Sequence, residues 1–130
     1  MAKKLVQETV AAPEKVVNEA TATVINAGVT PRKARLVIDC VRGKSLDEAY
    51  ALLSNLNKAA APIVLKLIKS CEANAVNNFN MSRENLYIAT IYANDGQRLK
   101  RFLPRAKGSA SGLVKRLSNI TVILKEKGNN

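Results

Sequence analysis

Positively charged side chains are the residues of this sequence whose type and spacing could do chemistry, and that chemistry is the binding of anions. Arg32, Lys33 and Arg35 stand within four positions of one another. A later series contains no acidic residue between Gly96 and Lys125; its members are Arg98, Lys100, Arg101, Arg105, Lys107, Lys115 and Arg116. Lysine and arginine at this density bind phosphate groups, so the sequence predicts a polyanionic partner, either nucleic acid or an anionic membrane surface.

Groups that could catalyse a reaction or bind a metal ion are scarce. The chain has no histidine, which removes the commonest general base and metal ligand. Cys40 and Cys71 form no CxxC pair and fall on apolar helical stripes, so we interpret both as core residues, with one disulfide as the alternative. The sequence contains no Walker loop and no GxSxG or GxGxxG motif. It therefore predicts no enzyme, no cofactor and no metal site.

Composition sets the size of the fold and the distribution of its charge. A chain of 130 residues that is 47% apolar can build one core, and its formal net charge is +11. Residues 1–19 are neutral, residues 20–94 carry +4 and residues 95–130 carry +7. We expect a flexible extension over 1–19, one domain over 20–130, and a binding surface concentrated towards the C-terminal end.

The start of the chain and its apolar runs bear on location. The opening MAKKLVQETVAAPEK is interrupted by polar residues and a proline, unlike a signal peptide. No stretch approaches the roughly 18 apolar residues of a membrane span. We therefore expect a cytoplasmic protein with no membrane partner.

Hydrophobic periodicity predicts the elements that must position the charged side chains. Residues 20–29 are typical of a strand, and Thr30 followed by Pro31 is typical of a helix start. This first helix should end at Gly43, and Ser45 with Glu48 predicts a capping box that opens a second. A third should begin near 59–61, because Pro62 is tolerated only in a first turn, and end near 77–78. The predicted buried stripes are Ala34, Val37, Ile38 and Val41; Ala49, Leu52, Leu53 and Leu56; and Val64, Leu67, Ile68, Cys71 and Ala75.

The C-terminal part of the sequence changes to a strand pattern. Residues 86–94 and 119–126 both predict strands, and the 24 residues between them are too many for a structureless loop. We expect both strands to continue outward as an arm over about 95–118 that turns near Pro104 to Gly112. The predicted fold class is α+β, with three helices packed on a small three-stranded antiparallel sheet and a long protruding β-hairpin.

Two features break structural rules and therefore point to a partner. Cations crowd the start of the first helix, where the macrodipole is already positive, so they either point into water or hold a phosphate together with the helix amides. The arm repels itself electrostatically and places Phe102 and Leu103 next to Pro104 near its tip. Phe102 is either an exposed wedge among nucleic-acid bases or folds back onto the core.

Four ordered motifs carry a resemblance to a known family: TPRKARLVIDCVRGKSLDEA, ANAVNN, LKRFLPRAKG and SNITVIL. Over about residues 20–127 the chain resembles the L-twenty-two family of large-subunit ribosomal proteins. The resemblance implies a structural constituent of the large ribosomal subunit that binds 23S-type rRNA, supports early subunit assembly and lines the nascent-peptide exit tunnel with its hairpin. It also implies rRNA, neighbouring ribosomal proteins and the nascent polypeptide as partners, with no homo-oligomer.

The predicted interface combines the cations of the arm with the positions that match the motifs of this family. The predicted rRNA-binding residues are Arg32, Lys33, Arg35, Arg42, Lys44, Asn74, Asn77, Asn78, Arg98, Lys100, Arg101, Arg105, Lys107, Lys115 and Arg116. The predicted tunnel-tip residues are Arg101, Phe102, Leu103, Pro104, Arg105, Ala106, Lys107 and Gly108. The chain departs from the family at 109–112, where Ser-Ala-Ser-Gly replaces the usual Arg-Ala-Asp, and at Asn119, which is commonly histidine.

Two other functions remain open from the residues alone. A DNA-architectural protein could wrap duplex DNA with such β-arms and insert the proline tip as a wedge, and it would usually be a tight dimer. A protein that binds anionic membranes or an acidic partner is the third possibility. It would be expected to carry a basic amphipathic helix, which this sequence lacks.

Overall fold

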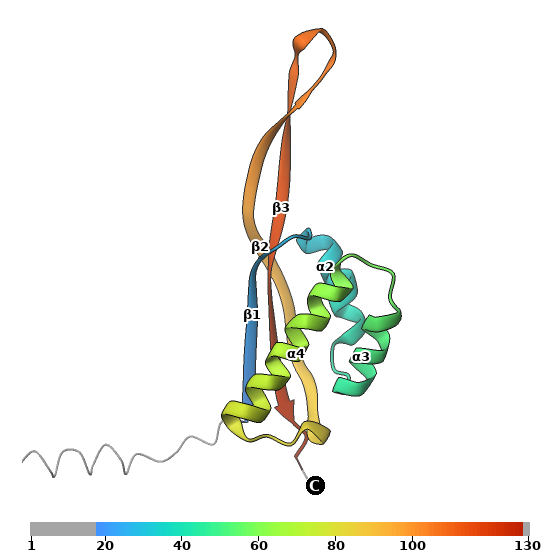
Figure 1. Ribbon diagram of the computed structural model, residues 1–130, viewed down its shortest axis with the longest axis vertical. Coiled ribbons are helices and arrows are strands. Elements are labelled where there is room, and N and C mark those ends of the chain that lie inside the picture. The colour runs from blue at the N-terminus through green and yellow to red at the C-terminus, as the bar shows by residue number, and fades with distance from the viewer. Residues whose placement is uncertain (1–17, 129–130) are drawn as a thin grey trace, which may run out of the picture.

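Three helices cover one face of a three-stranded antiparallel sheet, and two of the strands run far beyond the helices as a hairpin (Figure 1). The computed structural model describes residues 18–128. The helices are α2 (Pro31–Val41), α3 (Leu46–Asn55) and α4 (Ala60–Phe79). The strands are β1 (Glu19–Ala27), β2 (Leu86–Pro104) and β3 (Ala110–Glu126), with single 3-10 turns at Arg83–Asn85 and Ala106–Gly108. The predicted α+β class is confirmed.

The sheet has the order β1-β3-β2, so β3 is the central strand and pairs antiparallel on both sides. β1 begins at Glu19, which lies opposite Lys125 with its Oε1 2.5 Å from the lysine Nζ. The expected extension over 1–19 therefore reaches one residue too far. Its first 17 residues lie outside the described part of the chain.

The core lies between the sheet and the helices, and the alternation of β3 shows why. Ile120, Val122 and Leu124 are fully buried, while the residues between them are only half-buried. The predicted stripe of α4 is buried along its whole length. The helix begins at Ala60, which leaves Pro62 in the first turn, where its missing N–H breaks no helical hydrogen bond.

The connection between α2 and α3 lies against the outer edge of β2. The Gly43 N–H donates to the Ile88 carbonyl at 3.0 Å, and the Ile88 N–H donates to the Lys44 carbonyl at the same distance. Ser45 continues this contact as a bridge to Tyr87. The predicted capping box is wrong, since Ser45 precedes α3 but its side chain makes no cap hydrogen bond. Strand-like pairing sets the backbone at this position instead of a local cap.

Two of the predicted core positions are exposed. Leu52 is 42% exposed, because α3 buries only Leu46, Ala49 and Leu53. Cys40 is exposed because it lies off the buried stripe of α2, so its interpretation as a core residue is wrong.

Cys71 is buried as predicted, and both cysteines are free thiols. The Cys71 thiol donates to the Ala20 carbonyl at 3.2 Å. Burial raises the pKa of the Cys71 thiol to about 11, so at neutral pH the residue is an uncharged part of the core.

Candidate nucleic-acid interface

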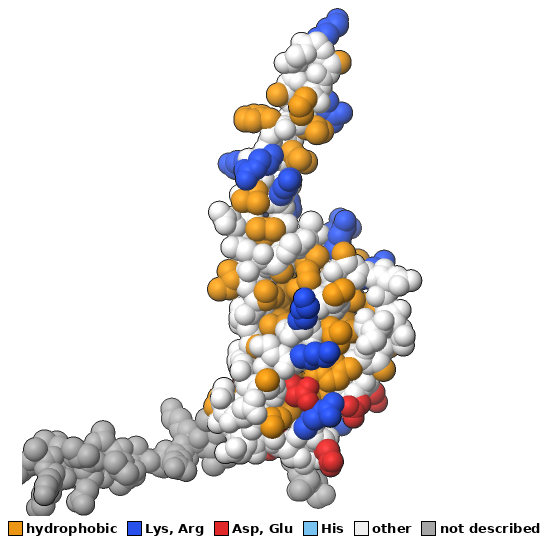
Figure 2. Space-filling model, in the orientation of Figure 1, with side chains coloured by type: hydrophobic (Ala, Val, Ile, Leu, Met, Phe, Trp, Pro, Cys, Tyr) orange, Lys and Arg blue, Asp and Glu red, His pale blue; other side chains and the backbone are white. Residues whose placement is uncertain are grey.

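The arm is the part of the molecule where cations gather with no buried residue beneath them. Between Gln97 and Arg116 no side chain is buried. Figure 2 shows blue Lys and Arg side chains alternating with orange apolar ones up to its tip. The hairpin turns between Pro104 and Ala110, within the predicted range.

The register of the arm decides which side chains share a face. The cross-strand partners are Arg98 and Arg116, Leu99 and Lys115, Lys100 and Val114, Arg101 and Leu113, Phe102 and Gly112, and Leu103 and Ser111. Three of these pairs set a cation opposite an apolar residue. Arg98 and Arg116 instead oppose like charge with like charge, which destabilises an isolated hairpin. A polyanion that reaches this pair would remove the repulsion.

The tip is a short loop with a specific backbone geometry. The Arg105 N–H donates to the Ser109 carbonyl at 2.8 Å, and the Ser109 N–H donates back to the Ala106 carbonyl at 3.3 Å. Lys107 and Gly108 close the turn in the left-handed region, with φ values of 58° and 72°. The left-handed lysine has no signal in the sequence other than the glycine that follows it.

Phe102 is 82% exposed on the arm, so the alternative in which it folds back onto the core is wrong. Its neighbour Leu103 is 39% exposed. An aromatic ring this far from any core finds apolar contact only on a partner, for example on the face of a nucleotide base.

The two serines of the 109–112 segment, Ser109 and Ser111, stabilise the tip through hydrogen bonds within the hairpin. The Ser109 hydroxyl donates to the Ala106 carbonyl at 2.8 Å. The Ser111 hydroxyl accepts a hydrogen bond from Nε of Arg105 at 3.2 Å and lies 3.5 Å from the Leu103 carbonyl. The contact with Ser111 holds the Arg105 guanidinium against the opposite strand of the hairpin.

Two asparagines brace the root of the arm. The Asn26 Oδ1 accepts the Gln97 N–H at 3.0 Å, while the Asn26 N–H donates to the Asn119 Oδ1 at 2.9 Å. Asn26 itself has a left-handed backbone, with φ of 55°. Gly96 lies beside this contact, and a Cβ there would come within 2.9 Å of the Asn26 Oδ1. Asn119 is thus part of the junction between body and arm.

The structure divides the predicted cations of α2 and of its C-cap residue Arg42 into two pairs. Arg32 and Lys33 are exposed in the first turn, which contains no acidic residue. Arg35 donates from Nε to the Ala93 carbonyl at 3.1 Å, and Arg42 donates from one guanidinium nitrogen to the Ile91 carbonyl at 3.0 Å. The first pair is available to a partner, whereas the second pair fastens α2 to β2.

The remaining predicted residues are spread over the body. Lys44 is half-buried in the connection that lies along β2. The Asn74 amide contacts the Thr21 carbonyl at 3.4 Å, so it bridges α4 and β1. Asn77 and Asn78 are exposed in the last turn of α4, at the end of the body opposite the arm (Figure 1). The structure does not bring these asparagines together with the arm, and any RNA contact they make is separate from that of the hairpin.

Lys58 is a cation of this region that sequence reasoning missed. It lies just before α4, and it lines a groove at the base of the arm together with Lys33 and Lys115. Nothing in its local sequence marks it, because its neighbours in the groove come from distant parts of the chain.

In the view of Figure 2, acidic side chains gather at the end of the body opposite the arm. There Arg83 bridges two of them, with its Nε 2.5 Å from Glu72 and a terminal nitrogen 3.7 Å from Asp47. The Tyr50 hydroxyl also donates to Glu72. Burial, and then this hydrogen bond, raise the pKa of Tyr50 above its ordinary value. The molecule is therefore polarised, with its positive end on the arm.

Residues 18–128 show neither a metal-binding cluster nor a membrane-spanning helix. Over residues 18–128, no three His, Cys, Asp or Glu side chains cluster as a metal site requires. None of the helices in this range is both long and apolar enough to cross a membrane.

A small α+β body that carries a long, cationic and unsupported β-hairpin defines a class of proteins built to place an arm among polyanions. The family model described as Ribosomal protein L22p/L17e matches residues 13–125, and the chain belongs to this family. It is thus a ribosomal protein, from a family of structural components and not of enzymes.

Curated relatives agree with this assignment over most of their length. A protein of Acetivibrio thermocellus named large ribosomal subunit protein uL22 is 54% identical over 101 residues, which are 78% of this chain and 81% of the relative. Proteins of the same name from Pediococcus pentosaceus and Clostridium novyi are each 50% identical. They cover 85% and 84% of this chain, and 94% and 98% of their own lengths.

Proposed function

We propose that this protein is a structural constituent of the large ribosomal subunit that binds 23S-type rRNA through its arm and the first turn of α2. The proposal includes a contribution to early subunit assembly and a place for the arm in the wall of the nascent-peptide exit tunnel. The names of the relatives support the assignment to the large subunit.

The proposal rests on one observation: the arm carries many positive charges but has no hydrophobic core beneath them. Seven cations from Arg98 to Arg116 lie on two strands and on the tip that joins them, a stretch with no buried residue and no acidic one. Neutralisation of phosphates by such cations supplies the binding free energy, and the shape of the folded RNA selects the site. The exposed Phe102 adds an apolar contact that phosphates alone would not need.

The expected surroundings follow from this proposal. The partners are rRNA, neighbouring ribosomal proteins and, at the tip of the arm, the nascent polypeptide. The protein acts as a single copy in the cytoplasmic ribosome, as one domain with its arm over about 95–118. The tip residues that face the tunnel are those between Arg101 and Gly108.

A competition experiment tests this function directly. The full-length protein is mixed with large-subunit rRNA and duplex DNA, matched in phosphate, at about 0.2 M monovalent salt, where general phosphate binding is weakened by orders of magnitude. A surviving one-to-one complex with rRNA, together with release of DNA, is expected. Equal retention of DNA, with a dimeric protein, would instead indicate the DNA-architectural function.

Variants then locate the binding surface. Arg101→Ala with Arg105→Ala should lower rRNA affinity at least tenfold, because two phosphate contacts near the tip are lost. The matched control is Lys66→Ala with Lys69→Ala, which removes two exposed cations from α4. Helical content should be unchanged in both. If the two double variants bind rRNA equally well, the arm is not the binding surface.

A further inference from the structure

A groove of about 730 Å³ lies where the arm leaves the body, between the start of α2, the segment before α4 and strand β3. Its lining includes Val29, Lys33, Leu36, Lys58, Val114 and Lys115. This volume is within the roughly 300–1,000 Å³ typical of sites for small ligands. The groove is therefore large enough to take one residue of a polymer, and it opens at the root of the arm.

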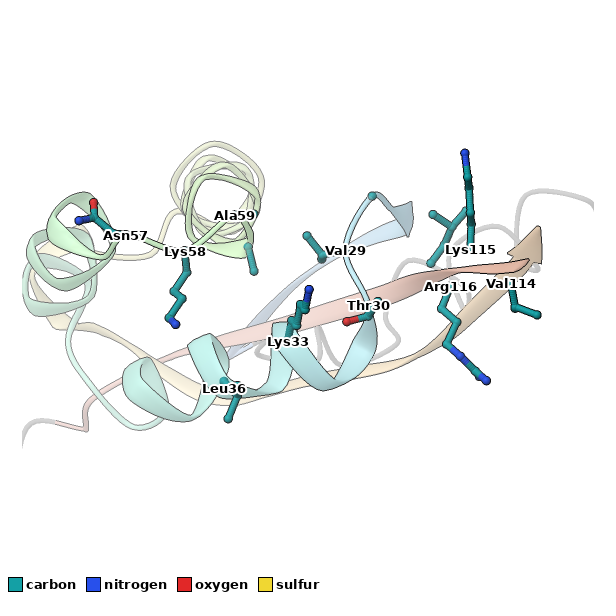
Figure 3. A pocket seen from close by; sticks show the side chains of 13 residues that line it. Val29, Thr30, Lys33, Leu36, Asn57, Lys58, Ala59, Val114, Lys115 and Arg116 are labelled. Carbon is teal, nitrogen blue, oxygen red and sulfur yellow. The ribbon is translucent and has the colours of Figure 1, made fainter. Parts of the chain in front are cut away.

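The charge of the groove is uniformly positive. The cations that line it, Lys33, Lys58, Lys115 and Arg116, come from three separate parts of the chain, and none of the residues that line the groove is acidic. None of the three lysines takes part in an ion pair among the described residues. In Figure 3, Lys33 from α2 and Lys58 from the opposite wall both extend into the space between them. This arrangement is suited to one anionic group held from two sides.

The backbone at the start of α2 also favours the binding of an anion in the groove. The first N–H that bonds within the helix is that of Ala34, to the Thr30 carbonyl at 3.0 Å. Thr30 lines the groove, and its side chain makes no cap hydrogen bond. The N–H groups of Arg32 and Lys33 and the Thr30 hydroxyl are thus available to an oxyanion beside the two lysines.

The apolar part of the lining indicates that the ligand is a nucleotide and not a simple anion. Leu36 is 62% exposed and Val114 is 44% exposed, although both are large hydrophobic residues. Leu36 follows Lys33 by one helical turn, so a cation and an apolar surface lie side by side on α2. A phosphate with an attached base matches this combination, because the base brings an apolar face as well as a charge.

We propose that this groove binds one unpaired nucleotide of the large-subunit rRNA, with its phosphate between Lys33 and Lys58 and its base against Leu36. The proposal rests on the function proposed above and deepens it. Lys115 and Val114 connect the groove to the arm, so the bound nucleotide belongs to an RNA strand that continues along the hairpin. An unpaired nucleotide is required because a base in a duplex cannot turn its face to the groove.

Chemical probing of rRNA bound to the full-length protein tests the proposal. Wild-type protein should protect an unpaired nucleotide from base-modifying reagents, and Leu36→Asp should restore its reactivity while leaving the protections made by the arm. Leu52→Asp is the matched control, since Leu52 is 42% exposed on α3 and lies outside the groove. Circular dichroism should show that both variants are folded.

A second pair of variants tests the phosphate contact. Lys58→Gln should weaken rRNA binding several-fold and lower the slope of log affinity against log salt by about 1, whereas Lys69→Gln should leave the slope unchanged. Lys58→Gln and Leu36→Asp should be non-additive if they act on the same nucleotide.

Three outcomes would overturn the proposal. Leu36→Asp could leave every protected nucleotide protected, Lys58→Gln could behave like Lys69→Gln, or cross-linking in the assembled subunit could place a protein segment in the groove. Failure of the wild-type protein to bind rRNA would instead overturn the proposed function, so the two failures are distinguishable.

Discussion

Strands β2 and β3 run through both the body and the arm, yet only the body has a hydrophobic core. Within the body, β2 and β3 bury residues such as Ile91 and Val122, which are at most 1% exposed, beneath the helices. Beyond Asp95 and Ser118 the register shifts, and from Arg98 and Arg116 the same strands continue as a pair with no helix on either face (Figure 1). The body is stabilised by apolar burial, and the arm must obtain most of its stability from a partner.

The largest expected effect comes from placing a charge in the core of the body. Val37→Asp should destabilise the protein by about 4 kcal/mol or more, because Val37 is 1% exposed and the new carboxylate would have no partner. Urea denaturation followed by circular dichroism measures the change. Leu36→Asp, one position earlier and 62% exposed, should change stability by about 1 kcal/mol or less. Similar losses in the two variants would contradict the assignment of the core.

Amide exchange in the free protein should separate the two regions. Residues 34–41 pack into the body and should exchange slowly, near the rate set by global unfolding, whereas 97–116 should exchange orders of magnitude faster. Hydrogen exchange with mass spectrometry of the free protein and of its rRNA complex measures both. The arm should become protected in the complex, and equal protection of both regions without RNA would show that the arm needs no partner.

Gly96→Ala tests how tightly the junction between the body and the arm is packed. The added Cβ would lie 2.9 Å from the Asn26 Oδ1 and 3.0 Å from the Leu117 carbonyl oxygen, and this crowding should cost about 1–3 kcal/mol. Thermal unfolding and the exchange rate of the Gln97 amide would show it. Gly112→Ala, with nothing within 4 Å of its Cβ, is the control and should be nearly neutral. The same penalty at both positions would mean that the junction is not tightly packed.

The smallest expected effect lies within the arm. Arg116→Thr removes the like charge opposite Arg98 and should stabilise the free hairpin by about 0.2–1 kcal/mol while weakening rRNA binding. Exchange rates of the arm amides should fall a few-fold. Lys115→Thr lies opposite Leu99 and should lack this gain. If both variants slow exchange equally, general charge and not the Arg98–Arg116 pair sets the stability of the arm.

Most of the helices and strands could be predicted because residues adjacent in the sequence determine where they begin, end and turn. Thr30 and Pro31 do start α2, the apolar period of α4 does mark its buried face, and the hairpin turns where proline and glycine occur. Cys40 shows where this reasoning failed. The helical period predicts a core position for this residue, but it lies off the stripe that contacts the sheet.

The features of the site that the sequence could not predict depend on contacts between residues far apart in the chain. The cations of α2 look alike in sequence, but Arg35 and Arg42 reach carbonyls of β2 that are 58 and 49 residues away. Lys58 joins Lys33 and Lys115 only because α2, the segment before α4 and β3 converge at the root of the arm. The brace formed by Asn26 and Asn119 likewise joins residues 93 positions apart.

The pairing of the α2–α3 connection with Ile88 has a consequence for the solubility of the protein before it finds a partner. Within the body, this connection covers the outer edge of β2, but beyond Asp95 neither edge of the hairpin is covered. Open edges with apolar side chains are templates for strand addition between copies, the first step of aggregation. Lysines and arginines spaced along both edges oppose this by mutual repulsion between copies. We therefore expect the side chains proposed to bind RNA to act also as gatekeeper residues that oppose aggregation of newly made copies of the protein.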